Sequence, residues 1–295
     1  MESNSFVHHV KRNPVFWIIL GLIGVTYWQT FVWMYDRWNA PETYYGHGFL
    51  IFPMSLFWLW NKRQSWSIET QPAHRLGLVI IAGSLLVQVM AVLTGIHFVS
   101  GFSLLPLLCG LVFYFGGWPW VKRLLFPILF LAFMIPAPLI LIANINLELK
   151  LFSTRVALKA VQLLGIVAIQ QGSMLVFENG IMIVGDICSG VRSTIALFAF
   201  SSYYAFWGQA RWIHRMILLA ISIPVAVFAN IVRIITVCLI AQVIGPEKTE
   251  GFIHDATGIL VFVVAFVVLL SVDKIIGGFF ALGQTKNGSG ESNDS

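Results

Sequence analysis

The strongest constraint on this chain is a series of apolar runs, each about long enough to cross a membrane as a helix. A run of about 20 apolar residues spans a bilayer core of about 30 Å. Apolar residues make up 58% of the 295 residues and charged residues only 11%, whereas a soluble domain carries about a quarter charged residues. The sequence therefore predicts an all-α polytopic membrane protein. We expect eight transmembrane helices, at residues 16–34, 45–60, 76–93, 99–115, 124–142, 191–207, 212–229 and 258–272.

The orientation follows from the basic residues, which gather in the cytoplasmic loops of membrane proteins. The loops alternate between a basic side, which is taken as cytoplasmic, and an outer side, whose short loops hold only Arg37 and Lys248. Both termini are therefore expected in the cytoplasm, and 16–34 is read as a retained span rather than a cleaved signal. The net charge of +5 is spread in pairs, so it indicates topology and no nucleic-acid partner. The basic side holds Lys11, Arg12, Lys62, Arg63, Arg75, Lys122, Arg123, Arg211, Arg215, Lys274 and Lys286.

One long outer connection, residues 143–187, precedes the sixth span. Its first part predicts an amphipathic helix lying on the membrane surface. Its second part predicts a hairpin of strands 174–177 and 181–184, because Asn179-Gly180 suits a type I′ turn. We expect a single membrane domain over residues 1–283 and a disordered polar tail over 284–295. The apolar face of the helix is assigned to Leu147, Leu151, Leu158 and Val161, opposite Glu148, Arg155 and Lys159.

The first polar group stands where the hairpin meets the sixth span. Cys188 is followed by Ser189 and Gly190 at the expected start of a helix, whose free N–H groups stabilise a thiolate. Arg192, four residues after Cys188, adds positive charge. The alternative is a cysteine that only packs at a helix start, with Ser189-Gly190 permitting a tight entry.

Two further polar groups lie near the same outer rim. Asn230 and Arg233 come just past the seventh span and share a helical face. His254 and Asp255 lead into the eighth span. Alternatively, Arg233 reaches lipid headgroups while Asn230 packs between helices, and His254 contacts interfacial water. A thiolate, an imidazole and a guanidinium at one level are the groups that acyl transfer needs.

The sequence resembles a known family through five short strings. Cys-Ser-Gly-Val-Arg-Ser (188–193), Asn-Ile-Val-Arg-Ile (230–234) and His-Asp-Ala-Thr-Gly (254–258) are similar to the signature set of exosortases and archaeosortases. Tyr-Gly-His-Gly (45–48), which contains His47, is similar to the family's early Tyr-Ser-His-Gly element. Phe-Met-Ile-Pro (133–136) matches a further element. Gly46 stands where serine is commoner, and Val191 where isoleucine or leucine is commoner.

The resemblance implies a multi-pass cysteine protease or transpeptidase of the bacterial inner membrane, with its active site on the periplasmic side. Its substrates would be exported proteins with a C-terminal sorting signal, made of a Pro-Glu-Pro-like motif, a transmembrane helix and a basic cluster. Cys188 would be the nucleophile, His254 the acid and base, and Arg233 the group that stabilises the transition state. A thioester would form and be resolved by a second nucleophile, such as an amine of an envelope component. Ser189, Gly190, Arg192, Asn230, Asp255 and His47 would support the site.

Two other functions remain open at this point. A transporter or lipid-handling protein would use Arg233 as an anion site and His254 as a proton relay. A scaffold for envelope polysaccharide export would need none of these residues for chemistry. No cofactor is expected, because the histidines show no ligand spacing and no nucleotide-binding glycine pattern occurs. Cys109 and Cys238 lie in apolar runs, where a thiol usually packs as a small core residue.

Overall fold

The computed structural model describes residues 14–41, 43–62, 74–177, 180–183, 190–207, 212–245 and 252–288, which are mostly helical. It divides into two units, Met1–Pro138 and Leu139–Ser295, and each is described by itself. Four described helices are long and apolar enough to cross a membrane, at Arg75–Thr94, His97–Met134, Trp212–Ile244 and Ala256–Gly277, and a bent helix pair gives a fifth candidate. The predicted polytopic membrane fold is therefore supported, and the chain is a multi-pass membrane protein.

The bent pair lies at the start of unit 1. Helices α2 (Pro14–Thr26) and α3 (Trp28–Asn39) meet at 64°, so the first predicted span is not one straight helix. The break leaves a backbone carbonyl without its helical partner. Gln88 Nε2 donates a hydrogen bond to that carbonyl, Thr26 O, at 3.0 Å. Gln88 Oε1 in turn accepts from Ser100 Oγ at 2.5 Å, and Tyr27 OH lies 2.9 Å from Ser103 Oγ.

The other helices of unit 1 are α4 (Gly48–Lys62), α5 (Arg75–Thr94) and α6 (His97–Phe130). Helix α6 turns sharply at Gly117, whose φ of 72° suits glycine. A short 3-10 helix, η2 (Leu131–Met134), follows, and the chain is extended at Ile135. The fifth predicted span, 124–142, is therefore not one continuous helix. Pro136 and Pro138 explain the break, since proline has no N–H to donate within a helix.

Unit 2 begins with α7 (Leu139–Leu163), whose buried side includes part of the predicted leucine face. Val161 is buried and Leu158 packs against the same core cluster, but Leu147 is 49% exposed. Small residues such as Ser153 and Ala157 share the packed side. Small side chains allow helix backbones to approach closely, which is how helices associate in lipid, where apolar contact alone gives little preference.

A three-stranded antiparallel sheet follows α7, with β1 (Ala168–Gln171), β2 (Met174–Phe177) and β3 (Gly180–Ile183) in that order. Strands β2 and β3 occupy the positions of the predicted hairpin, while β1 is an additional strand. Asn179 of the predicted turn lies outside the described residues. The sheet packs on α7 and the second half of α9 through one apolar cluster, whose members are Ala157, Val161, Ala168, Leu175, Phe177, Met182, Ile234, Val237, Cys238 and Ala241.

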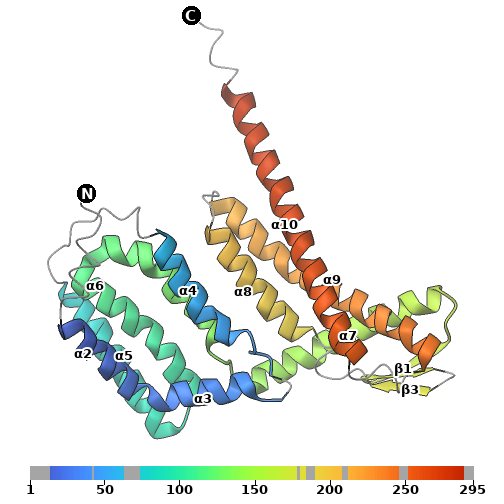
Figure 1. Cartoon of the computed structure of the whole chain (residues 1–295), viewed down its shortest axis with the longest axis horizontal. Coiled ribbons are helices and arrows are strands. Elements are labelled where there is room, and N and C mark those ends of the chain that lie inside the picture. The colour runs from blue at the N-terminus through green and yellow to red at the C-terminus, as the bar shows by residue number, and fades with distance from the viewer. Residues whose placement is uncertain are drawn as a thin grey trace, which may run out of the picture. The chain divides into compact units, whose positions relative to one another are not determined.

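Helices α8 (Val191–Trp207), α9 (Trp212–Ile244) and α10 (Phe252–Gly288) form a bundle. Figure 1 shows α8 and α9 side by side with α10 packed against them, and contacts join all three pairs. Helix α9 continues 15 residues beyond the predicted end of the seventh span at Ala229, so Asn230 and Arg233 lie inside a helix. The reason is that the apolar pattern resumes after Arg233, where α9 packs against the sheet.

Candidate active site

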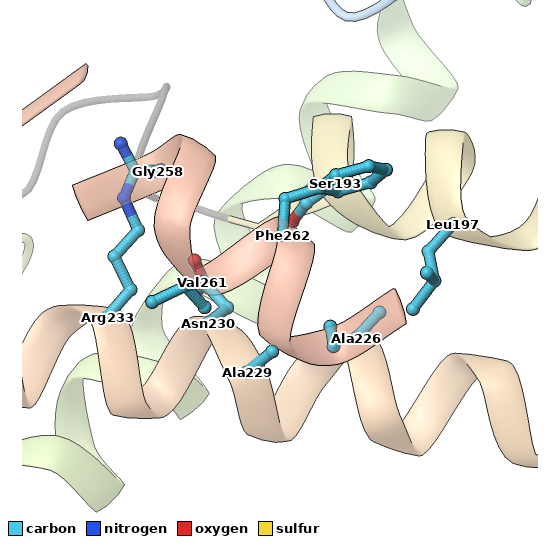
Figure 2. A pocket seen from close by; sticks show the side chains of 10 residues that line it. Ser193, Leu197, Ala226, Ala229, Asn230, Arg233, Gly258, Val261 and Phe262 are labelled. Carbon is cyan, nitrogen blue, oxygen red and sulfur yellow. The ribbon is translucent and has the colours of Figure 1, made fainter. Parts of the chain in front are cut away.

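A pocket lies between α8, α9 and α10, near the start of α8 and of α10 (Figure 2). Helix α8 contributes Ser193, helix α9 contributes Asn230 and Arg233, and helix α10 contributes Gly258. Each of the three signature strings therefore supplies at least one lining residue. We call it the motif pocket, and its complete lining is Ser193, Leu197, Ala226, Ala229, Asn230, Arg233, Gly258, Val261, Phe262 and Ala265.

The first and second strings meet where Gly190 packs against Asn230. Gly190 has φ of +83°, a conformation that favours glycine, and a Cβ built on it would lie 2.6 Å from Asn230 Cγ. Glycine is thus required here for both its conformation and its size. The Gly190 carbonyl begins α8, because it accepts hydrogen bonds from Thr194 N at 2.8 Å and from Ser193 Oγ at 2.9 Å. The segment that enters α8 is therefore held against α9 at Asn230.

The second and third strings meet where Arg233 reaches across to α10. Figure 2 shows its side chain extending from α9 toward Gly258. A Cβ built on Gly258 would lie 2.8 Å from Arg233 Nη2 and 3.0 Å from Cζ, so the guanidinium lies directly against this glycine. Arg233 is only 8% exposed and Asn230 3%. A charge buried this far in a membrane protein generally faces a partner or a cavity, and here it lines the motif pocket.

The packing of the pocket's apolar wall holds these groups in place. Leu197, Ala226 and Ala265, one from each helix, form a buried cluster, and Phe262 packs against it. Beyond Arg233, the next residue of α9, Ile234, is 2% exposed and belongs to the cluster that joins α9 to the sheet. The part of α9 that carries Arg233 is therefore held by packed clusters on both sides along the helix.

The other predicted site residues either lie outside the described residues or do not line the pocket. Cys188 and Ser189 lie outside the described residues. His254 and Asp255 belong to the first turn of α10, but their side chains are outside what the structure describes, and His254 precedes Gly258 by four residues. Arg192 is half-buried at the second position of α8 and is not among the residues that line the motif pocket. The structure thus brings together Gly190, Asn230 and Arg233 from the predicted set.

Sequence reasoning did not single out Ser193 and Gly258, although both end one of the signature strings. The signal that could have found Gly258 was its spacing. A glycine one helical turn after His254 leaves room on the same face of the helix for a large side chain from a neighbour. Arg233 occupies that room. The apolar lining residues Leu197, Val261 and Phe262 carry no signal that separates them from ordinary membrane-helix residues.

The remaining two strings meet each other within unit 1. Tyr45 OH accepts a hydrogen bond from Ala137 N at 3.1 Å, and Trp38 Nε1 donates to Met134 O at 2.8 Å. The segment around His47 is therefore anchored to the Phe-Met-Ile-Pro segment. His47 itself is half-buried and packs near the Tyr45 ring, with centroids 5.8 Å apart. These two side-chain hydrogen bonds tie the chain around the first string to the backbone in and just after the second.

The fold and the pocket together define a class, a multi-pass helical membrane protein with a buried arginine facing a pocket that is built from three helices. The family model described as transmembrane exosortase matches residues 38–271 of the chain. This range covers well over half of the 295 residues and includes all five strings, so the chain belongs to the exosortase family, as its motifs predicted. Comparisons with curated proteins and with solved structures found no match.

Proposed function

We propose that this chain is a membrane-embedded cysteine transpeptidase that cleaves the C-terminal sorting signals of exported proteins. Family membership supports the protein-sorting role. The observation that carries the proposal is the motif pocket, because Gly190 and Ser193, Asn230 and Arg233, and Gly258 come together from three separate parts of the sequence. Residues of three strings that converge beside a guanidinium supply a group that can stabilise the oxyanion of acyl transfer.

In the first half-reaction, the Cys188 thiolate attacks the carbonyl carbon of the scissile peptide bond. The carbonyl oxygen becomes an oxyanion, and the Arg233 guanidinium stabilises it through charge-assisted hydrogen bonds. His254 gives a proton to the departing amine, the C–N bond breaks, and the C-terminal anchor leaves. The product is a thioester between Cys188 and the exported protein. Cys188 precedes α8 by three residues, where the free N–H groups of a helix start favour a thiolate.

In the second half-reaction, an amine of an envelope component, or water, attacks the thioester carbon. His254 takes a proton from this nucleophile, and the Cys188 thiolate departs when the C–S bond breaks. Arg233 stabilises the oxyanion in this step as well. His254 and Gly258 are one turn apart on α10, and Gly258 contacts Arg233, so the proposal requires the imidazole and the guanidinium to serve the same carbonyl.

The proposal includes a location and a topology. The protein resides in the bacterial inner membrane with eight spans and both termini in the cytoplasm, and the motif pocket opens toward the periplasm. Both units act as one polytopic domain over residues 1–283, and residues 284–295 are a polar tail. The distribution of lysine and arginine supports this orientation. Its proposed partners are exported proteins that carry a sorting signal, the lipid bilayer, and envelope polysaccharide components.

The deciding experiment compares wild type with Cys188→Ala in membranes. A tagged substrate with a Pro-Glu-Pro-like C-terminal signal is followed by its size shift. Processing by wild type that vanishes in Cys188→Ala at equal membrane levels supports the proposal. Cys109→Ala is the matched control, since that thiol lies in α6 of unit 1. Full processing by Cys188→Ala would refute the mechanism and favour a role, such as transport, that uses Arg233 without a thiol.

A further inference from the structure

Three polar side chains meet at the end of the α8–α9–α10 bundle opposite the motif pocket, and each belongs to a different helix. Asp273 of α10 accepts a hydrogen bond from His214 Nε2 of α9 at 2.7 Å through Oδ1. Its other oxygen, Oδ2, accepts from Tyr204 OH of α8 at 3.0 Å. We call these three residues the Asp273 clasp. His214 is 9% exposed, so the contact is largely shielded from the surroundings.

Each helix of the bundle carries one clasp residue and at least two residues of the motif pocket. With one pocket residue taken from the signature string of each helix, the pairs are Tyr204 and Ser193 on α8, His214 and Arg233 on α9, and Asp273 and Gly258 on α10. At a rise of 1.5 Å per residue, these pairs are about 16, 28 and 22 Å apart along their helices. Between the clasp and the pocket, Ala205, Leu218 and Leu269 form a buried apolar cluster, and Leu197, Ala226 and Ala265 form another at the pocket wall. The buried Ser201, Ser202 and Ser222 donate hydrogen bonds to carbonyls of their own helices, so they do not join one helix to another.

Apolar layers alone define the relative positions of membrane helices poorly, because lipid tails are as apolar as the side chains they would replace. A carboxylate with two fixed partners on two other helices is different, since sliding or rotating any one helix breaks a hydrogen bond. Setting register is the best-attested role of buried polar contacts. The distance from Asp273 to Gly258 along α10 also amplifies a small tilt of this helix. A tilt of α10 by about 3° at Asp273 moves Gly258 by about 1 Å, and a misplacement of that size can reduce a rate by about 10²-fold.

We propose that Asp273 is a positioning residue which, through His214 and Tyr204, sets the register of α8, α9 and α10 and thereby the position of Arg233 against Gly258. The effect of Asp273 on the reaction rate rests on the function proposed above. Its effect on the register of the three helices does not. The clasp and the motif pocket lie at opposite ends of the bundle. The clasp acts on the reacting atoms only through the three helices that carry the signature strings.

The test uses the full chain in lipid nanodiscs and three variants of the clasp. Asp273→Ala removes the shared acceptor. Asp273→Asn keeps polar atoms in both positions. The triple variant Tyr204→Phe, His214→Leu and Asp273→Leu replaces the clasp by apolar contacts. Lys274→Ala is the control, because Lys274 is the next residue of α10 and is exposed. The measurements are kcat and KM for a sorting-signal substrate, the unfolding midpoint, and the rate at which a small alkylating reagent modifies Cys188.

We expect Asp273→Ala to lower kcat by at least about tenfold with KM within about twofold, and Asp273→Asn to retain kcat within about threefold. The triple variant should recover the unfolding midpoint, because apolar replacement of a buried ion pair is often neutral or stabilising. Its kcat should stay at least about tenfold low, and its Cys188 alkylation rate should change by at least about threefold. Lys274→Ala should match wild type in every measurement.

Recovery of both stability and kcat in the triple variant would overturn the inference, because the clasp would then only stabilise the bundle. If the triple variant does not fold, the comparison is between Asp273→Ala and Asp273→Asn. Equal losses of kcat in these two variants would overturn the inference, because the polar contacts kept by asparagine would then not matter for the rate. If wild type processes no substrate but the clasp variants still change Cys188 alkylation, the proposed function fails and the positioning role stands. If wild type processes substrate and neither kcat nor alkylation responds to the clasp, the positioning role fails alone.

Discussion

Replacing Gly258 by alanine should separate the activity of this protein from its stability. The added Cβ would lie 2.8 Å from Arg233 Nη2, whereas ordinary contact begins at about 3.4 Å, so the guanidinium must move by about 0.6 Å. The guanidinium is the far end of a flexible side chain, so this movement needs little energy. Alanine also favours a helix over glycine by about 1 kcal/mol. The unfolding midpoint should therefore stay equal or rise.

Activity should respond in the opposite direction. A misplacement of 1 Å can reduce a rate by about 10²-fold, so a movement of about 0.6 Å should lower kcat by about 10- to 30-fold. The assay is single-turnover processing of a sorting-signal substrate by purified protein in nanodiscs, with unfolding followed in parallel. Gly83→Ala on α5 is the matched control, since it makes the same helix substitution with nothing within 4 Å of the new Cβ.

A double-mutant cycle shows whether Gly258→Ala acts through Arg233. In an Arg233→Ala background the added methyl has no guanidinium to displace, so Gly258→Ala should have no further effect on kcat. An equal loss in both backgrounds would refute the reasoning, because the methyl would then act on something else. A kcat within twofold of wild type for Gly258→Ala alone would also refute it, since the position of the guanidinium would not matter.

Three other pairs of substitutions have defined outcomes. Arg233→Lys should lower kcat by about 10- to 10²-fold in the same assay, because lysine keeps the charge without the planar pair of donors. Arg233→Ala should lower it by about 10²- to 10³-fold. Equal rates for Arg233→Lys and wild type would contradict this role. Gly165 has φ of +85° and open space around it, so Gly165→Ala should lose about 1–2 kcal/mol of unfolding free energy through backbone strain alone. Gly190→Ala should lose at least about 1 kcal/mol more, because its Cβ also meets Asn230. Equal losses in denaturant titration would show that contact with Asn230 adds no cost. Gln88→Leu should destabilise the protein by about 1–2 kcal/mol, because Thr26 O at the α2–α3 bend loses its donor, while the exposed neighbour Val89→Leu should change stability little.

The membrane fold and the convergence of the signature strings were predictable for physical reasons. Apolar runs of this length are typical of helices that cross a bilayer. Residues of three separate strings meet at one pocket because the spans alternate in direction, which returns the starts of α8 and α10 to the same end as Arg233. Arg233 itself was identifiable, since an arginine flanked by Ile231, Val232, Ile234 and Ile235 needs a specific reason to be there.

Other features depend on contacts that a linear pattern does not record. The apolar run at residues 16–34 gave no sign of the bend that Gln88 supports from 62 residues away. The leucine face predicted for α7 was confirmed in part, since Val161 and Leu158 belong to the packed side. The pattern did not indicate Ser153 and Ala157, whose small size allows the close packing seen there. The clasp was missed for a related reason. His214, Tyr204 and Asp273 look like unconnected residues near loop ends until three helices bring them together.

The length of α9 has a consequence for where the reaction takes place. Its 33 residues measure about 50 Å, more than the roughly 30 Å of hydrocarbon that it must cross. Arg233 lies 21 residues after Trp212, or about 32 Å along the axis, so a helix that enters the hydrocarbon near Trp212 brings its guanidinium out at the opposite boundary. Under the proposed orientation, the bond that is cut lies where lipid gives way to water. In the proposed reaction, an acceptor amine dissolved outside would then reach the thioester without entering lipid, while the released anchor would stay in the bilayer.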